Sequence, residues 1–222
     1  VDAETYGPLK ALSEQAAARA MPGRTTVLRP GLIVGPHDNT DRFTYWPARA
    51  AAGGEFVAPG SPRDPIQCID ARDLARFALD CIEQKYVGTY NVTSPPGRFS
   101  MGALVSASIS AAVAFAKPEV DPAPMWMPAD FLASQGVQAW SDMPVWLPAE
   151  GSQLAFAATR VDRALQAGLS VRALQSTVDD TLTWHLGRPD TERASLKTGL
   201  ARDKEARVLA AWHARTDEPA TS

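Results

Sequence analysis

The sequence predicts an α/β fold, and three stretches carry this prediction. Residues 25–34 are β-branched and apolar, as is typical of a buried strand, and Gly35-Pro36 ends the run. Residues 88–93 read as another strand of the same sheet. Between them, residues 70–85 have the apolar spacing of an amphipathic helix.

The first residues predict a helix that carries a chemically useful pair. Helix formers dominate residues 6–20, so Tyr6 and Lys10 would stand one turn apart on the same face. An ammonium near a phenol favours the phenolate, which would let Tyr6 exchange a proton with a substrate oxygen. The alternative is that this spacing arose by chance.

A polar loop over residues 37–42 follows the first strand, and residues 43–54 predict a helix. Loops beyond the carboxyl ends of strands are where open α/β sheets bind ligands. His37, Tyr45 and Trp46 are therefore candidates to line a pocket. The alternatives are packing of the two aromatic rings beneath the loop and simple solvation of His37.

Residues 56–60 predict a short strand and turn, and residues 65–69 an alternating run before the 70–85 helix. Asp70 and Asp73 stand where that helix begins, which favours capping over catalysis. A further helix is expected over residues 100–116.

Residues 117–148 are rich in proline, tryptophan and methionine, and no regular element is predicted there. Their apolar side chains fit a pocket wall, a dimer contact or a satellite core equally well. The set comprises Met125, Trp126, Met127, Trp140, Met143 and Trp146. Beyond it we expect a short strand and a helix over 156–169, helices over 174–186 and 194–214, and a disordered end over 216–222.

Composition narrows the classes of partner. The chain has 222 residues and a formal net charge of -3, which leaves no basic footprint for nucleic acid. No apolar run reaches the roughly 18 to 20 residues that span a bilayer, so no membrane partner is expected. Cys68 and Cys81 lack Cys-x-x-Cys spacing, which predicts buried free thiols and a cytoplasmic location. The three histidines are widely separated, so no metal site is expected.

Three motifs in order carry a family resemblance. They are Tyr-x-x-x-Lys over 6–10, Leu-Arg-Pro-Gly-Leu-Ile-Val-Gly-Pro over 28–36, and the segment 63–75. Together they resemble the extended short-chain dehydrogenase/reductase family of NAD(P)-dependent epimerases, dehydratases and reductases, and the reductase-like members most closely. The resemblance covers roughly the first hundred residues well.

The resemblance implies the remainder of a Rossmann-type doubly wound parallel sheet and a smaller, mainly helical substrate-binding part. Residues 1–98 would belong to the Rossmann-like domain, 99–187 to the substrate-binding region and 188–222 to a helical tail. The family's Gly-rich turn and active-site Ser or Thr have no counterpart ahead of Tyr6. We therefore expect the C-terminal part of a longer protein, with the missing N-terminal half as a covalent or associated partner.

The resemblance also implies roles for individual residues. Tyr6 would be the catalytic acid/base, and Lys10 would hold the ribose hydroxyls of NAD or NADP. The segment Pro30, Gly31, Leu32 and Ile33 would lie against the nicotinamide. Arg63 falls where nucleotide-sugar members place an arginine on the substrate phosphate.

These expectations lead to one function and two alternatives. The function is NAD(P)-dependent reduction of a small carbonyl substrate, with Tyr6 as proton donor and a homodimer as the expected assembly. The alternatives are a nucleotide-sugar epimerase or dehydratase of the same family and a non-catalytic scaffold without cofactor binding. A severed sheet would expose a strand edge, so the chain alone should associate or aggregate.

Overall fold

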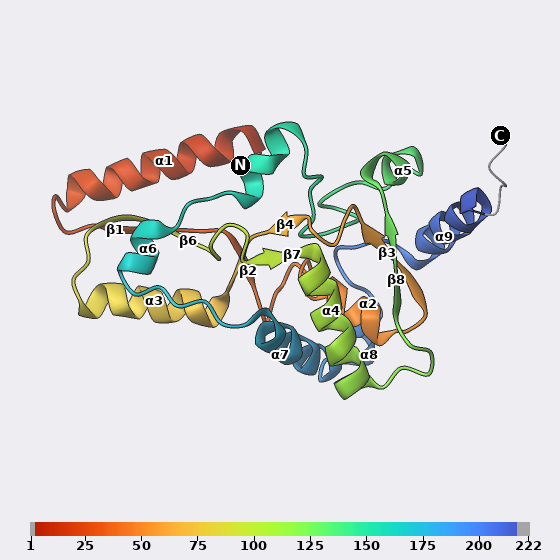
Figure 1. Ribbon diagram of the computed structural model, residues 1–222. Coiled ribbons are helices and arrows are strands. Elements are labelled where there is room, and N and C mark those ends of the chain that lie inside the picture. The colour runs from red at the N-terminus through yellow and green to blue at the C-terminus, as the bar shows by residue number, and fades with distance from the viewer. Residues whose placement is uncertain (1–2, 217–222) are drawn as a thin grey trace.

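The computed structural model describes residues 3–216 as a mixed α/β protein (Figure 1). Each of its strands pairs with a single neighbour in this range. Three pairs are parallel: β1 (Thr26–Pro30) with β6 (Gly88–Val92), β2 (Leu32–Val34) with β5 (Cys68–Asp70), and β3 (Glu55–Pro59) with β8 (Ala123–Met127). The fourth, β4 (Pro65–Ile66) with β7 (Phe99–Ser100), is antiparallel. The predicted α/β fold with parallel pairing is therefore confirmed.

The predicted first strand is divided at Gly31. β1 ends at Pro30 and pairs with β6, whereas β2 begins at Leu32 and pairs with β5. The Gly31 N–H still donates to the Val92 carbonyl, 3.1 Å away. One run of sequence thus forms two strands, and Gly31 lies between the carboxyl end of β1 and the amino end of β2.

Helices surround these strands (Figure 1). Several are close to the sequence expectation, including α3 (Ala71–Glu83), α4 (Met101–Ala111) and α7 (Leu174–Leu186). α4 continues into a π-helical segment, Ala112–Ala116. The others are α1 (Ala3–Ala20), α2 (Tyr45–Ala51), α5 (Ala129–Ser134), α6 (Asp162–Gln166), α8 (Asp190–Arg193), α9 (Arg202–Thr216) and a 3-10 helix (Gly151–Ala157).

Three local expectations were wrong. The proline-rich stretch contains strand β8, because residues 123–127 find a parallel partner in β3. The strand expected near residue 156 is the 3-10 helix instead. Residues 194–201 are not helical, and the expected disordered end lies mostly outside the described residues.

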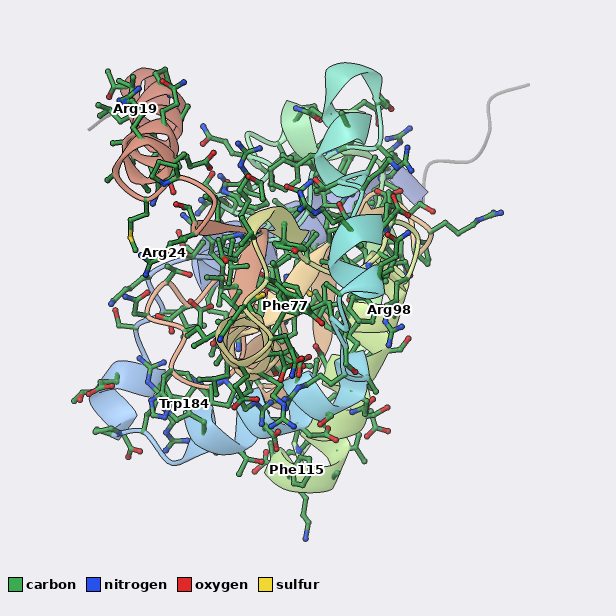
Figure 2. All side chains as sticks on the ribbon, turned by 90° about the vertical axis from the view of Figure 1, so that its left-hand side faces the viewer. Arg19, Arg24, Phe77, Arg98, Phe115 and Trp184 are labelled. Carbon is green, nitrogen blue, oxygen red and sulfur yellow. The ribbon has the colours of Figure 1, made fainter. Side chains whose placement is uncertain are left out.

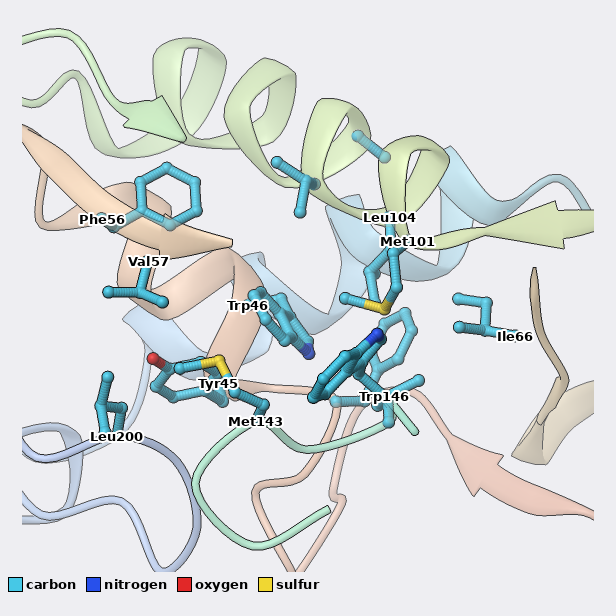
Figure 3. Packing of buried hydrophobic residues seen from close by; sticks show 14 of the residues in the cluster. Tyr45, Trp46, Phe56, Val57, Ile66, Met101, Leu104, Met143, Trp146 and Leu200 are labelled. Carbon is cyan, nitrogen blue, oxygen red and sulfur yellow. The ribbon is translucent and has the colours of Figure 1, made fainter. Parts of the chain in front are cut away.

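One large hydrophobic cluster joins the segments that the sequence divides into three parts. It contains Phe56 of β3, Leu104 of α4 and Trp146 from the proline-rich stretch (Figure 3). Leu182 of α7 and Val208 of α9 belong to the same cluster. The tryptophan and methionine residues are largely part of this core, which favours the packing alternative for most of them. A second cluster lies between α3, β6 and α6.

α1 stands apart from this body, with Arg19 near its end (Figure 2). Nearly all of its described side chains are exposed. Its attachments include an ion pair between Glu14 and Arg29 at 2.5 Å and hydrogen bonds from the Thr25 hydroxyl to the helix end. Little apolar surface of α1 is therefore buried.

Candidate functional site

A cavity of about 1050 Å3 opens at the carboxyl ends of β1, β2 and β6. Residues 30–40 form one wall, and Thr93, which follows β6, forms part of another. Tyr6 of α1, Gln67 and Phe156 of the 3-10 helix also line it. The position agrees with the general rule for ligand binding in open α/β folds.

Tyr6 and Lys10 occupy successive turns of α1 at the edge of this cavity. The Lys10 Nζ lies 5.8 Å from the centroid of the Tyr6 ring. Tyr6 lines the cavity and keeps 58% of its surface exposed, whereas Lys10 is not among the lining residues. The helix thus presents a phenol to the cavity with an ammonium beside it.

Pro30, Gly31, Leu32 and Ile33 all line the cavity. Gly31 is required by a close approach: a Cβ there would lie 2.6 Å from the Thr93 Oγ1. That hydroxyl is buried and has no hydrogen-bond partner among the described residues. The cavity wall therefore holds an unsatisfied polar group, a feature that sequence reasoning missed.

His37 lies in the cavity wall in a strained backbone conformation. Its φ is +68°, in the left-handed region that is uncommon for residues other than glycine. Its ring packs against Trp184 of α7, with centroids 5.3 Å apart. The neighbouring Asp38 fixes the loop by accepting hydrogen bonds from Thr40 and from the Phe43 N–H.

A second aromatic wall includes Trp140, for which the sequence left a pocket wall as one of three alternatives. The Trp140 and Phe156 rings meet edge to face at 5.0 Å, and both residues line the cavity. The Arg42 guanidinium lies 5.7 Å from the Trp140 ring centroid and also faces the cavity. These residues come from three distant segments, so no sequence motif could have grouped them.

Tyr45, Trp46 and Arg63 do not line this cavity. Tyr45 and Trp46 are 3% and 1% exposed and belong to the core (Figure 3). Burial and the nearby Glu205 carboxylate raise the pKa of Tyr45 far above its usual value. The expectation that the two rings reach the pocket was wrong, because α2 turns them inward. Arg63 is exposed in the 61–64 turn.

The acidic residues at the start of α3 are structural. Asp70 caps α3 by accepting from the Arg72 N–H, and it also accepts from the Thr177 hydroxyl. Burial opposes ionisation of Asp70, but these hydrogen bonds and the Arg72 guanidinium hold its pKa below the usual value. Asp73 is bound by Arg172. The expectation of capping over catalysis is confirmed for Asp70.

The prediction that the two thiols are buried and free is also confirmed for Cys68 and Cys81. None of the helices described within residues 3–216 has the length and apolar character that a membrane crossing requires. Within the same range, no group of three His, Cys, Asp or Glu side chains is placed to hold a metal ion.

No family model and no curated protein matches the sequence. Solved structures do match the fold. RMD from Pseudomonas aeruginosa, complexed with NADPH, has a TM-score of 0.53 at 13% identity, over 81% of this chain and 55% of its own. UDP-glucose 4-epimerase from Thermus thermophilus, complexed with NAD, has a TM-score of 0.51 at 14% identity, over 82% and 52%.

A GDP-L-fucose synthetase from Naegleria fowleri, bound to NADP, has a TM-score of 0.52 at 17% identity, over 83% of this chain and 53% of its own. The chain thus spans about half the length of these structures. Over that half, it has the Rossmann-type α/β fold of these structures.

Proposed function

We propose that this chain is the C-terminal part of an NAD(P)-dependent oxidoreductase that reduces a small carbonyl substrate. The observation that carries the proposal is that Tyr6 and the segment Pro30–Ile33 line one cavity, with Lys10 one turn from Tyr6. The fold similarity to proteins bound to NADPH, NAD and NADP supports it.

The residues present fit a nicotinamide. Gly31 and Thr93 both line the cavity, and the buried Thr93 hydroxyl, which has no partner among the described residues, would offer a donor and an acceptor to a carboxamide. Lys10 would hold the ribose hydroxyls. When bound, the cofactor would supply hydride to the carbonyl carbon.

Tyr6 would donate its proton to the oxygen of the same carbonyl as negative charge develops there. The Lys10 ammonium would stabilise the phenolate that remains, because opposite charges favour the ionised form. Solvent at the exposed edge of Tyr6 would then return the proton. His37, on the neighbouring wall, would contact the substrate.

The test uses the full-length protein that we propose. Tyr6→Phe should lower kcat roughly 10²- to 10⁴-fold, the usual contribution of a general acid, with little change in cofactor affinity. Lys10→Met should raise the KM for the cofactor. Tyr86→Phe is the matched control, because this ring packs on Tyr90 outside the cavity. Full activity in Tyr6→Phe would contradict the proposal.

A second function in the same family is supported by the fold likeness to a UDP-glucose 4-epimerase. Such an activity would invert or dehydrate a nucleotide sugar without net consumption of the dinucleotide. Arg63, the expected phosphate ligand, lies outside the cavity, which weighs against it. Product analysis with and without added NADPH separates the reductase from the epimerase or dehydratase activity. If the full-length protein binds no dinucleotide, the non-catalytic scaffold is the alternative that fits.

A further inference from the structure

We infer that the cavity takes a substrate whose oxyanion adjoins a flat unsaturated group, and that Arg42 and Trp140 hold these two parts. The inference rests on the proposed function only in treating this cavity as the substrate site. It concerns the part of the cavity wall formed by Arg42, Trp140 and Phe156, to which the sequence resemblance assigned no role.

Arg42 is the one arginine or lysine among the described residues that line the cavity. Its guanidinium makes no hydrogen bond and no ion pair within residues 3–216; its contact is with the Trp140 ring. Other arginines that reach into the fold are engaged: Arg49 with Glu205, and Arg188 with Asp41. Five N–H donors beside a cavity are thus available to an acceptor.

No ion pair joins Arg42 to a neighbouring carboxylate in the described part of the chain. Asp38 lines the same cavity, but both of its oxygens accept hydrogen bonds from Thr40 or Phe43. Asp41 is buried, and its oxygens accept from Arg188 and from the Lys197 N–H. The cation at the cavity wall is therefore free to pair with an anion.

Trp140 is held in place by the backbone. Its φ is +68°, which is costly for a bulky residue, and its N–H is directed at the carbonyls of Met143 and Trp146 at 3.2 and 3.1 Å. Strained residues of this kind cluster at functional sites. Because Phe156 meets Trp140 edge to face, the pair forms a rigid apolar wall next to the guanidinium.

A guanidinium beside an aromatic wall has a defined preference. Its planar fork binds carboxylate or phosphate oxygens in pairs, and the ring stacks on a flat group. An aryl or conjugated keto acid and a nucleoside diphosphate both present an oxyanion near a flat ring. Neutral aliphatic carbonyl compounds lack both features.

The experiment measures ligand affinity by calorimetry in the full-length protein, before any turnover. The probes are benzoylformate, which carries a carboxylate, its neutral counterpart acetophenone, and uridine diphosphate. We expect benzoylformate or uridine diphosphate to bind at least roughly 10-fold more tightly than acetophenone, because each can form hydrogen bonds between a charged group and Arg42. Which of them binds distinguishes a carboxylate from a phosphate as the natural anion.

Arg42→Gln should weaken binding of the preferred anion roughly 10- to 100-fold, as expected for loss of hydrogen bonds to a charged group, and leave acetophenone unchanged. Arg42→Lys should restore part of the loss. Trp140→Leu should weaken binding of both the anion and acetophenone. Arg63→Gln, at an exposed arginine outside the cavity, is the matched control and should change neither affinity. A thermal melt of each variant confirms that it is folded.

Equal affinity for benzoylformate, uridine diphosphate and acetophenone, or an unchanged anion affinity in Arg42→Gln, would overturn the inference. Dinucleotide binding, measured separately, distinguishes this failure from failure of the proposed function. If NADPH binds and Tyr6→Phe is inactive while the anion preference is absent, only the inference fails. If Arg42-dependent anion binding occurs without dinucleotide binding, only the proposed function fails.

Discussion

At the residue scale, Gly31 and Thr93 set the shape of the cavity wall. A Cβ at position 31 would lie 2.8 Å from the Thr93 Cβ as well as 2.6 Å from its Oγ1. We expect Gly31→Ala to destabilise the protein by about 1–3 kcal/mol, the usual cost of overpacking. Urea unfolding of Gly31→Ala, Thr93→Gly and the double variant measures the coupling between the two sites.

The matched control for this cycle is Gly7→Ala. A Cβ at position 7 would meet open space, and the residue lies within α1, so alanine there should be neutral or stabilising. Purely additive costs in the double variant would show that the two side chains do not collide.

Cys68 gives a second prediction at this scale. Burial, with the Asp70 charge nearby, raises the pKa of the Cys68 thiol to about 12. Because the thiolate is the reactive form, native protein should react very slowly with a disulfide reagent, and urea-unfolded protein quickly. Rapid labelling of Cys68 in the native state, read by peptide mass, would contradict the burial.

Sequence reasoning found the residues of the site that lie in local motifs. Tyr6 was singled out by its helical spacing from Lys10 and the Pro30–Ile33 segment by the family resemblance, and each of these signals lies in consecutive residues. Arg42 was not identified, and Trp140 was left among three alternatives, because their 5.7 Å approach depends on how distant loops fold together. The prediction that Tyr45 lines the pocket was wrong, because its position after a strand does not reveal which way α2 turns its side chains.

At the element scale, a buried ion pair holds α9 against α2 and β3. Glu205 accepts from the Arg49 Nε at 2.7 Å and from the Val57 N–H at 3.2 Å, with both charged side chains at most 5% exposed. Glu205→Ala would leave the Arg49 charge buried, so we expect a loss of about 3–5 kcal/mol in urea unfolding.

The same helix offers a matched control. The ion pair between Asp203 and Arg207 is 74% and 69% exposed, so Asp203→Ala should cost less than about 1 kcal/mol. Similar losses in the two variants would show that burial does not determine the cost.

Asp70 joins α3 to α7 and makes stability depend on pH. A folded pKa below the unfolded value of about 4 means that the ionised carboxylate stabilises the fold above that pH. This contribution is lost as the pH falls through the folded pKa. Since Asn caps helices as well as Asp, Asp70→Asn isolates the charge.

We expect Asp70→Asn to cost about 1–3 kcal/mol at pH 7, the range for hydrogen bonds to a charged group. The difference from the parent protein in urea unfolding should shrink steadily as the pH falls below about 5. A difference that does not change with pH would assign the effect to packing.

Element prediction succeeded where propensity and tertiary contacts agreed. The 174–186 helix has the predicted bounds, since its apolar side chains face the core. The helix predicted over 194–214 starts only at residue 202, because residues 197 and 198 are bound elsewhere. The Lys197 N–H donates to Asp41, and the Thr198 hydroxyl donates to the Thr40 carbonyl. Such contacts override local propensity.

At the scale of the whole molecule, α1 exposes apolar side chains that the rest of the described chain does not cover. Tyr6, Leu9 and Leu12 are 58%, 45% and 54% exposed, and they follow one another at helical spacing. β1 pairs only with β6 in the described part of the chain, so a strand edge lies open near the same helix. Apolar surface and an open edge together favour association.

We therefore expect the 222-residue chain alone to self-associate in analytical ultracentrifugation. Leu9→Glu combined with Leu12→Glu should shift it toward monomer without lowering the unfolding midpoint, because α1 buries little against the body. Leu79→Glu with Ile82→Glu is the matched control, since these side chains on α3 are 55% and 72% exposed but lie away from α1. If the control pair dissociates the chain equally well, general charge repulsion rather than the α1 face governs association. If the parent chain is a monodisperse monomer that unfolds cooperatively, the expectation that it needs a partner half is wrong.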